Sequence, residues 1–224
     1  MSLNVKAWLG LFFLALAMAL LVFIPAGTLR YWQGWLFLAA FFASGVSHTR
    51  YGMKKDPALL ERRLAGGPMA ERSGTQRTIM LFISLGFIGL LVVPALGWRL
   101  GEGALPLAVV MAGNALIIVG FFIVFLAFRE NTFAAANVDI FPGQRVVSSG
   151  PYAVVRHPQY AGAFLYLLGI PLALGSWWGV LVFAAMVPFL IWRLLDEERD
   201  LTAGLPGYTD YRNRVRWRLI PGIY

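Results

Sequence analysis

Long apolar blocks separated by short polar stretches dominate the pattern along the chain. Blocks of about 20 apolar residues are long enough to cross a bilayer as helices. The apolar residues are continuous and do not alternate with a period of two, which favours helices over the strands of a barrel. The blocks cover residues 8–25, 31–47, 78–97, 105–128 and 160–195, the last with a break at 175–178. The pattern predicts an all-α integral membrane protein with four transmembrane helices and a C-terminal helical hairpin.

The composition supports a membrane protein and limits its chemistry. Of 224 residues, 59% are hydrophobic and 13% are charged, whereas soluble domains have roughly half apolar and a quarter charged residues. The chain has no cysteine, which excludes a disulfide, a thiolate metal site and a cysteine nucleophile. His48 and His157 are its two histidines, so a histidine-rich metal centre is excluded and no metal is predicted.

The basic residues predict the orientation of the helices. If loops alternate between the two sides and the fifth block returns as a hairpin, all of the 19 lysines and arginines except Arg30 and Arg99 lie on one side. By the positive-inside rule, that side is cytoplasmic and carries both termini and both long loops. A single crossing by the fifth block would move the C-terminal arginines outside and weaken this asymmetry. The charge is therefore explained by topology and by attraction to anionic lipid, not by nucleic acid.

The chain is predicted to form one integrated domain with two parts. Residues 1–128 form the four-helix membrane region, and residues 129–224 contain a polar loop, the hairpin and a polar tail. In the first long loop, Asp56 and Pro57 are typical of a helix start and Gly66 of a helix end. They predict a short amphipathic helix on the membrane surface, either an ordinary surface helix or a part of the route for a substrate.

The two ends of the hairpin are predicted to bring polar residues together. With a turn near residue 176, antiparallel helices place residues whose numbers sum to about 353 opposite each other. The ionisable and aromatic residues that converge are Arg156, His157, Tyr160, Arg193, Glu197 and Glu198. Arg193 and Glu197 are also four apart on one helix, within side-chain reach. Taken singly, each residue is typical of an interfacial anchor or a salt bridge; together they suit a ligand that carries both a cation and a carboxylate.

These residues belong to a longer motif. The segment 149–162, Ser-Gly-Pro-Tyr-Ala-Val-Val-Arg-His-Pro-Gln-Tyr-Ala-Gly, resembles the signature of the isoprenylcysteine carboxyl methyltransferase family and its phospholipid methyltransferase relatives. The resemblance continues through Glu197-Glu198 and the tail, over about residues 137–224. The chain departs from the pattern at Gln144, where family members often carry histidine.

The resemblance implies an enzyme that transfers a methyl group from S-adenosylmethionine, with S-adenosylhomocysteine as product. Its acceptor would be lipid-like or prenylated, with a carboxylate favoured, at the cytoplasmic membrane interface, and no obligate protein partner is inferred. Arg193 or Arg156 would orient a carboxylate, while Glu197 would accept the proton of an amine or phenol. The residues implied at the cofactor are Asn137, Val146, Val147, Tyr152, His157, Tyr160, Glu197 and Glu198.

Two other classes of function remain open from the sequence. A membrane sterol or steroid reductase that uses NADPH has a related C-terminal architecture, and residues 218–224 resemble its ending. Against it, residues 159–162 and the paired glutamates differ from that family's pattern. A non-enzymatic membrane protein, such as a carrier, is the second alternative. Against it, the cores of the first four spans carry almost no ionisable groups to form an ion path.

Overall fold

The computed structural model describes residues 1–66, 71, 73–102, 105–134 and 141–224, and these contain helices and no strand. The all-α prediction is confirmed. The long helices are α1 (Leu3–Ala26), α2 (Trp32–Lys55), α4 (Gly74–Arg99), α5 (Leu107–Glu130), α6 (Pro158–Ala173) and α7 (Trp177–Gly204). The short ones are α3 (Pro57–Leu64), the 3₁₀ helix η2 (Gly150–Ala153) and α8 (Tyr208–Arg214).

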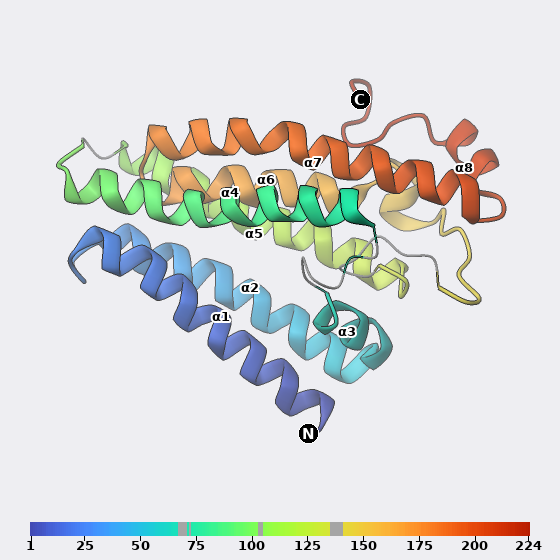
Figure 1. Cartoon of the computed structure of the whole chain (residues 1–224), viewed down its shortest axis with the longest axis horizontal. Coiled ribbons are helices and arrows are strands. Elements are labelled where there is room, and N and C mark those ends of the chain that lie inside the picture. The colour runs from blue at the N-terminus through green and yellow to red at the C-terminus, as the bar shows by residue number, and fades with distance from the viewer. Residues whose placement is uncertain (67–70, 72, 103–104, 135–140) are drawn as a thin grey trace.

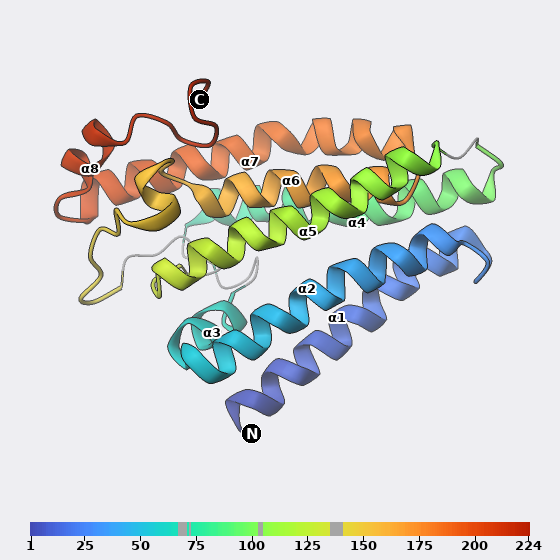
Figure 2. The same cartoon turned by 180° about the vertical axis from the view of Figure 1, so that it is seen from behind.

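The long helices form a bundle in which α1 and α2 diverge from the rest at one end (Figures 1 and 2). Helices α4 to α7 run side by side, and the α1–α2 pair packs on them through contacts of α1 with α4 and of α2 with α5. Both termini, α3 and α8 lie toward the same end, while the α1–α2 and α6–α7 turns lie at the other (Figure 1). The long helices thus alternate in direction, as predicted from the placement of the basic residues.

In the part of the chain that the structure describes, four helices are long and apolar enough to cross a membrane: α1, α4, α5 and α7. The sequence analysis also counted a span at residues 31–47, which the structure extends into the 24-residue α2. Polar residues fill the last turns of α2, among them His48 and Arg50, so its average hydropathy falls below that of the four. Helix α6 is 16 residues long, and with α7 it forms the predicted hairpin.

The hairpin turn lies close to where the sequence placed it. Helix α6 ends at Ala173 and α7 begins at Trp177. Gly175 has a left-handed φ of 75°, a conformation that glycine adopts without steric cost. The side chain of Ser176 accepts a hydrogen bond from the backbone nitrogen of Gly179 at 3.3 Å and caps α7. A left-handed glycine followed by a serine cap explains the sharp reversal.

Glycines allow α5 and α6 to pack with their backbones almost in contact. A Cβ on Gly162 would lie 2.5 Å from the carbonyl oxygen of Gly120, and a Cβ on Gly120 would lie 2.5 Å from that of Gly162. Small residues at facing positions permit this approach between membrane helices. The packing fixes the start of α6, and with it residues 156–160, beside the end of α5.

The predicted short helix is confirmed as α3. The Asp56 side chain accepts a hydrogen bond from the Leu59 backbone nitrogen at 3.0 Å, and Pro57 occupies the first turn. Leu59 and Leu60 are buried, whereas Leu64 is 40% exposed. From this helix Arg62 donates a hydrogen bond to the Thr132 carbonyl at 2.6 Å. Helix α3 therefore contacts the polar loop that follows α5.

Candidate functional site

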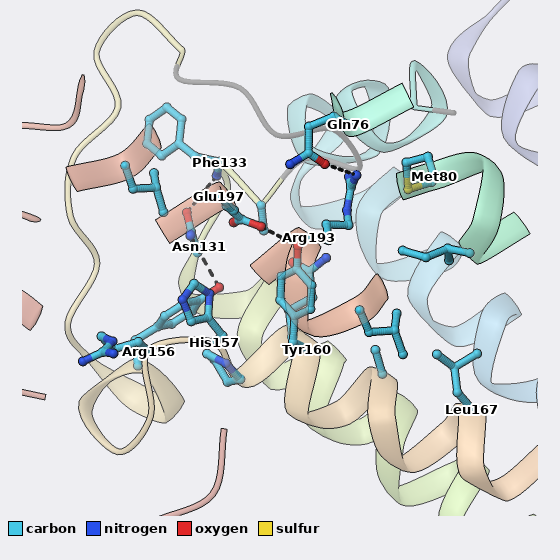
Figure 3. A pocket seen from close by; sticks show the side chains of 18 of the residues that line it. Gln76, Met80, Asn131, Phe133, Arg156, His157, Tyr160, Leu167, Arg193 and Glu197 are labelled. Carbon is cyan, nitrogen blue, oxygen red and sulfur yellow. Dashed lines mark hydrogen bonds between the residues drawn. The ribbon is translucent and has the colours of Figure 1, made fainter. Parts of the chain in front are cut away.

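A cavity of about 980 Å³ lies at the end of the bundle that holds α3 and α8. Figure 3 shows 18 of its lining side chains. Its polar part is formed by residues 131–134, 144–147 and 152–160 and by the last turns of α7; its apolar part is lined from α1, α2, α4 and α6. Apolar residues of this second part include Leu11, Leu14, Phe41, Met80, Phe87 and Leu167. The cavity is therefore amphiphilic.

Glu197 and Tyr160 meet across the hairpin in the polar part. The Tyr160 hydroxyl donates a hydrogen bond to Oε2 of Glu197 at 2.6 Å (Figure 3), and both residues line the cavity. This contact joins the first turn of α6 to α7, as predicted from the antiparallel pairing of the two hairpin helices. It fixes a half-buried carboxylate at the cavity wall, where an acceptor-only group suits a cationic ligand.

Glu198 is adjacent in sequence but has a different environment. It is 4% exposed and forms an ion pair with Arg156, from Nε to Oε1 at 2.7 Å. Its Oε2 accepts a hydrogen bond from Nε of Arg218 at 2.8 Å, and Nε2 of His157 lies 3.9 Å from Oε1. We call Arg156, His157, Glu198 and Arg218 the tail cluster. Of the two acids, Glu197 is thus placed to meet a ligand and Glu198 to hold the C-terminal tail.

The tail cluster continues through the backbone. The Arg156 nitrogen donates to the Trp217 carbonyl at 2.9 Å, and the His157 nitrogen to that of Arg218 at 2.9 Å. One guanidinium nitrogen of Arg156 also donates to the carbonyl oxygens of Val215 at 3.0 Å and Arg216 at 3.2 Å. This geometry favours a bracing role for Arg156, and the acceptor-orienting role implied by the resemblance stays a prediction.

A further part of the cavity wall is aromatic and aliphatic. Tyr152 of η2 packs with Tyr208 and Tyr211 of α8, and Val146 and Val147 pack against them. The Tyr211 hydroxyl donates to the Tyr152 carbonyl at 2.8 Å. Burial raises the pKa of Tyr152 to about 12, so its phenol stays neutral at physiological pH. A neutral aromatic wall suits a flat ring or a cation.

Two polar groups add specificity to this wall. The Tyr208 hydroxyl is buried without a hydrogen-bond partner among the described residues, and Tyr208 lines the cavity. Buried polar groups are nearly always paired, so an unpaired one at a cavity points to a ligand. Asn131 donates from Nδ2 to the Tyr152 hydroxyl at 3.4 Å (Figure 3). Asn137, which the resemblance implied at the cofactor, lies outside the described residues.

Arg193 forms a second buried network, on the α4 side of the cavity. One guanidinium nitrogen forms an ion pair with Oε1 of Glu71 at 2.7 Å, and the other donates to Oε1 of Gln76 at 2.8 Å. Gln76 in turn donates to Oδ2 of Asp196 at 2.5 Å. We call Glu71, Gln76, Arg193 and Asp196 the α4-side cluster. The i,i+4 spacing suggested Glu197 as a partner of Arg193; the structure gives Arg193 an ion pair with Glu71, and the Glu197 charge also acts on the guanidinium.

Glu71 and Gln76 were missed by the sequence analysis. Glu71 is an acid in a loop rich in arginine, and Gln76 is a polar residue just before an apolar block. Both signals are weak, because charged and polar residues are usual at the ends of membrane helices. Their partner Arg193 is more than a hundred residues away in the chain, so spacing cannot reveal the pair.

The site thus belongs to a multi-helix membrane protein with an amphiphilic cavity at one end. Residues 108–205 match the phospholipid methyltransferase family. A protein-S-isoprenylcysteine O-methyltransferase of Schizosaccharomyces pombe is 36% identical over 72 residues, which is 31% of this chain. The match spans 30% of the length of that relative. The family resemblance read from the sequence is therefore confirmed for the part of the chain that builds α5, α6, α7 and the polar end of the cavity.

Proposed function

We propose that the protein is an S-adenosylmethionine-dependent methyltransferase that acts on a lipid-like or prenylated acceptor, with a carboxylate favoured. One observation carries the proposal: the segment that matches the family builds the polar end of a cavity that continues into an apolar end. A volume of about 980 Å³ is at the upper end of ordinary small-molecule pockets. It suits a cofactor together with part of a second substrate.

The residues present fit the cofactor. Its ammonium and sulfonium groups are cationic, and Glu197, held by Tyr160, offers a carboxylate at the cavity wall. Its adenosine needs an apolar or aromatic surface and hydrogen-bond donors, which Val146, Val147 and the unpaired Tyr208 hydroxyl supply. S-adenosylmethionine brings a methyl group already activated by a positive sulfur, so the reaction requires no metal.

The rest of the cavity favours an amphiphilic acceptor. Its apolar part, lined from α1, α2 and α4, would remove an acyl or prenyl chain from water and stabilise it in proportion to the apolar area buried. Arg193 also lines the cavity, one helical turn before Glu197 on α7. Its guanidinium would orient the headgroup. A guanidinium orients a carboxylate through directed hydrogen bonds.

The chain's contribution to the chemistry is then mainly positional. A carboxylate acceptor is already nucleophilic, so the residues need to hold it in line with the methyl group and to exclude water. Arg193 would orient the carboxylate, and the apolar lining of the cavity would exclude water. For an amine or phenol acceptor, Glu197 would accept the proton, because it is the carboxylate that lines the cavity beside Tyr160.

We place the site at the cytoplasmic interface. All lysines and arginines except Arg30 and Arg99 fall on the loops and tails assigned to one side. Both termini lie toward the end that holds the cavity (Figure 1). The positive-inside rule then supports a cytoplasmic position for both termini and for the cavity's polar end.

Calorimetry on the purified protein in detergent tests the proposal. S-adenosylhomocysteine should bind and NADPH should not. Membranes incubated with S-adenosylmethionine labelled in its methyl group should then transfer label to a lipid or prenylated fraction. Binding of NADPH alone would favour the reductase, and binding of neither ligand would favour the non-enzymatic alternative.

A further inference from the structure

Two consecutive arginines of α3 contact the segment that follows α5. The guanidinium of Arg62 donates a hydrogen bond to the Thr132 carbonyl at 2.6 Å, and that of Arg63 donates to the Ala134 carbonyl at 3.4 Å. Leu59 of the same helix is buried in one apolar cluster with Ala134. Helix α3 therefore holds this segment through both polar and apolar contacts.

Arg62 also faces two phenylalanine rings. Its guanidinium carbon lies 5.3 Å from the ring centroid of Phe133 and 5.3 Å from that of Phe141, within the range of a cation–π interaction. Phe133 lines the cavity. The backbone nitrogen of Phe141 donates to Oε1 of Gln144 at 3.0 Å, and Gln144 lines the cavity as well. Arg62 does not itself line the cavity, yet it is connected to two stretches of its wall.

The contacts continue from Phe133 to the tyrosines of the cavity wall. The Phe133 backbone nitrogen donates to Oδ1 of Asn131 at 3.0 Å, and Nδ2 of Asn131 donates to the Tyr152 hydroxyl at 3.4 Å (Figure 3). One side-chain amide thus uses its acceptor on Phe133 and its donor on Tyr152. Because the amide is planar, a shift of Phe133 would also move the donor that Tyr152 receives.

We propose that Arg62 is a positioning residue for the cofactor site, because it holds Phe133 at the cavity wall from outside the cavity. The inference rests on the proposed function, in which the polar end of the cavity binds the cofactor. Without the guanidinium, Phe133 would lose the cation that its ring faces, and the wall would no longer be fixed before the ligand binds. A wall that must be ordered on binding lowers the affinity. Helix α3 is then neither an ordinary surface helix nor a part of the route for a substrate, but a support of the cavity wall.

The affinity of Arg62→Gln for S-adenosylhomocysteine, measured by calorimetry on the full chain in detergent, tests the inference. We expect about a tenfold loss, because the cation–π contacts and the hydrogen bond from a charged donor are removed together. Arg62→Lys keeps a cation that can face a ring and donate to Thr132, and it should bind within about threefold of the unchanged protein. Lys55→Gln removes an exposed positive charge at the end of α2. It is the matched control, and its affinity should equal that of the unchanged protein.

A double-mutant cycle separates positioning from general stabilisation of the fold. Phe133→Leu removes the ring that Arg62 faces at the cavity and should itself weaken binding by about tenfold. If Arg62 acts through Phe133, adding Arg62→Gln to Phe133→Leu should weaken binding by less than about threefold more, whereas independent effects would multiply. Each variant is first checked for a monodisperse profile in detergent. If Arg62→Gln does not fold, Arg62→Met, which keeps the apolar stem and removes the cation, replaces it in every comparison.

The outcomes distinguish this inference from the function on which it rests. If the unchanged protein does not bind S-adenosylhomocysteine, the proposed function is wrong. If it binds and Arg62→Gln binds equally well, or Lys55→Gln loses as much affinity as Arg62→Gln, the positioning role is overturned. Multiplying losses in the double variant, or an Arg62→Lys as weak as Arg62→Gln, overturn it also. A loss in Arg62→Gln that lysine largely restores and that Phe133→Leu masks supports it.

Discussion

The two buried ionic clusters on α7 have similar compositions and different positions. The α4-side cluster joins Arg193 to Glu71 and lines the cavity, whereas the tail cluster joins Glu198 to Arg156 and Arg218 and holds the C-terminal segment. Each contains at least one arginine and one nearly fully buried acid. The comparison shows that burial and pairing do not by themselves identify the functional group. What distinguishes Glu197 is its position at the cavity, where it accepts a hydrogen bond from the Tyr160 hydroxyl.

The largest expected effect comes from breaking the tail cluster. Glu198→Gln leaves Arg156 buried without its carboxylate, which we expect to destabilise the protein by about 3 kcal/mol. For a chain of this size, that corresponds to a fall in Tm on the order of 10 °C. Thermal unfolding in detergent measures it. At low temperature the folded fraction should still bind S-adenosylhomocysteine, and complete loss of binding without a fall in Tm would contradict the assignment.

The same glutamate-to-glutamine change at the neighbouring Glu197 should weaken binding and leave the stability almost unchanged. We expect Glu197→Gln to weaken S-adenosylhomocysteine binding by about 100-fold while changing Tm little, because a partly buried carboxylate that pairs with a ligand cation is lost. Calorimetry beside thermal unfolding gives both quantities. Glu61→Gln serves as the surface control. Equal affinity in Glu197→Gln and the unchanged protein would remove Glu197 from the cofactor site.

Tyr160→Phe refines this contrast. The substitution keeps the ring and removes the hydroxyl that donates to Glu197. We expect about a tenfold loss of cofactor affinity, since a hydrogen bond to a charged group contributes about 1.5 kcal/mol. The effect should vanish in a Glu197→Gln background, where there is no carboxylate to orient. Additive losses in the double variant would show that Tyr160 acts independently of Glu197.

The smallest effect at physiological pH comes from the tyrosine wall. Burial raises the pKa of Tyr152 to about 12, against about 10 in an unfolded chain. Because its pKa is higher in the folded state, the protonated phenol contributes to the free energy of unfolding. This contribution is fully present below pH 10 and is lost as pH rises toward 12. Ionisation of Tyr152 should therefore not change the cofactor affinity between pH 7 and 9. Tyrosinate absorbs near 295 nm, so a pH titration followed at this wavelength checks the prediction. Tyr152→Phe should show one tyrosine with a raised pKa fewer than the unchanged protein.

Much of the fold could be predicted because lipid imposes strict rules on a chain. The apolar blocks, the helix start at Asp56-Pro57 and the reversal near Ser176 are local signals, and each corresponds to an observed element. The ends of helices were predicted less well: α1 begins at Leu3 and α2 continues to Lys55. Helices can extend beyond the apolar core, because their backbone hydrogen bonds need no lipid, and hydropathy does not detect those polar turns.

The candidate site was predicted in part. The sequence motif and the hairpin geometry brought Tyr160 to Glu197 and Arg156 to the paired glutamates, as the structure does. Neither could assign the two glutamates to different environments, since that depends on how α7 is rotated against its neighbours. Nor could they find Glu71, because its contact with Arg193 depends on the packing of α4 against α7.

The sequence by itself determined the class of protein, the order of its helices and the family resemblance of its C-terminal part. These follow from hydrophobicity, helix punctuation and charge placement, which are properties of residues and their near neighbours. Only the tertiary structure decided which acid meets the cavity and which carboxylate pairs with Arg193. Both depend on side chains from segments far apart in the chain, and a buried charge takes the partner that packing brings to it.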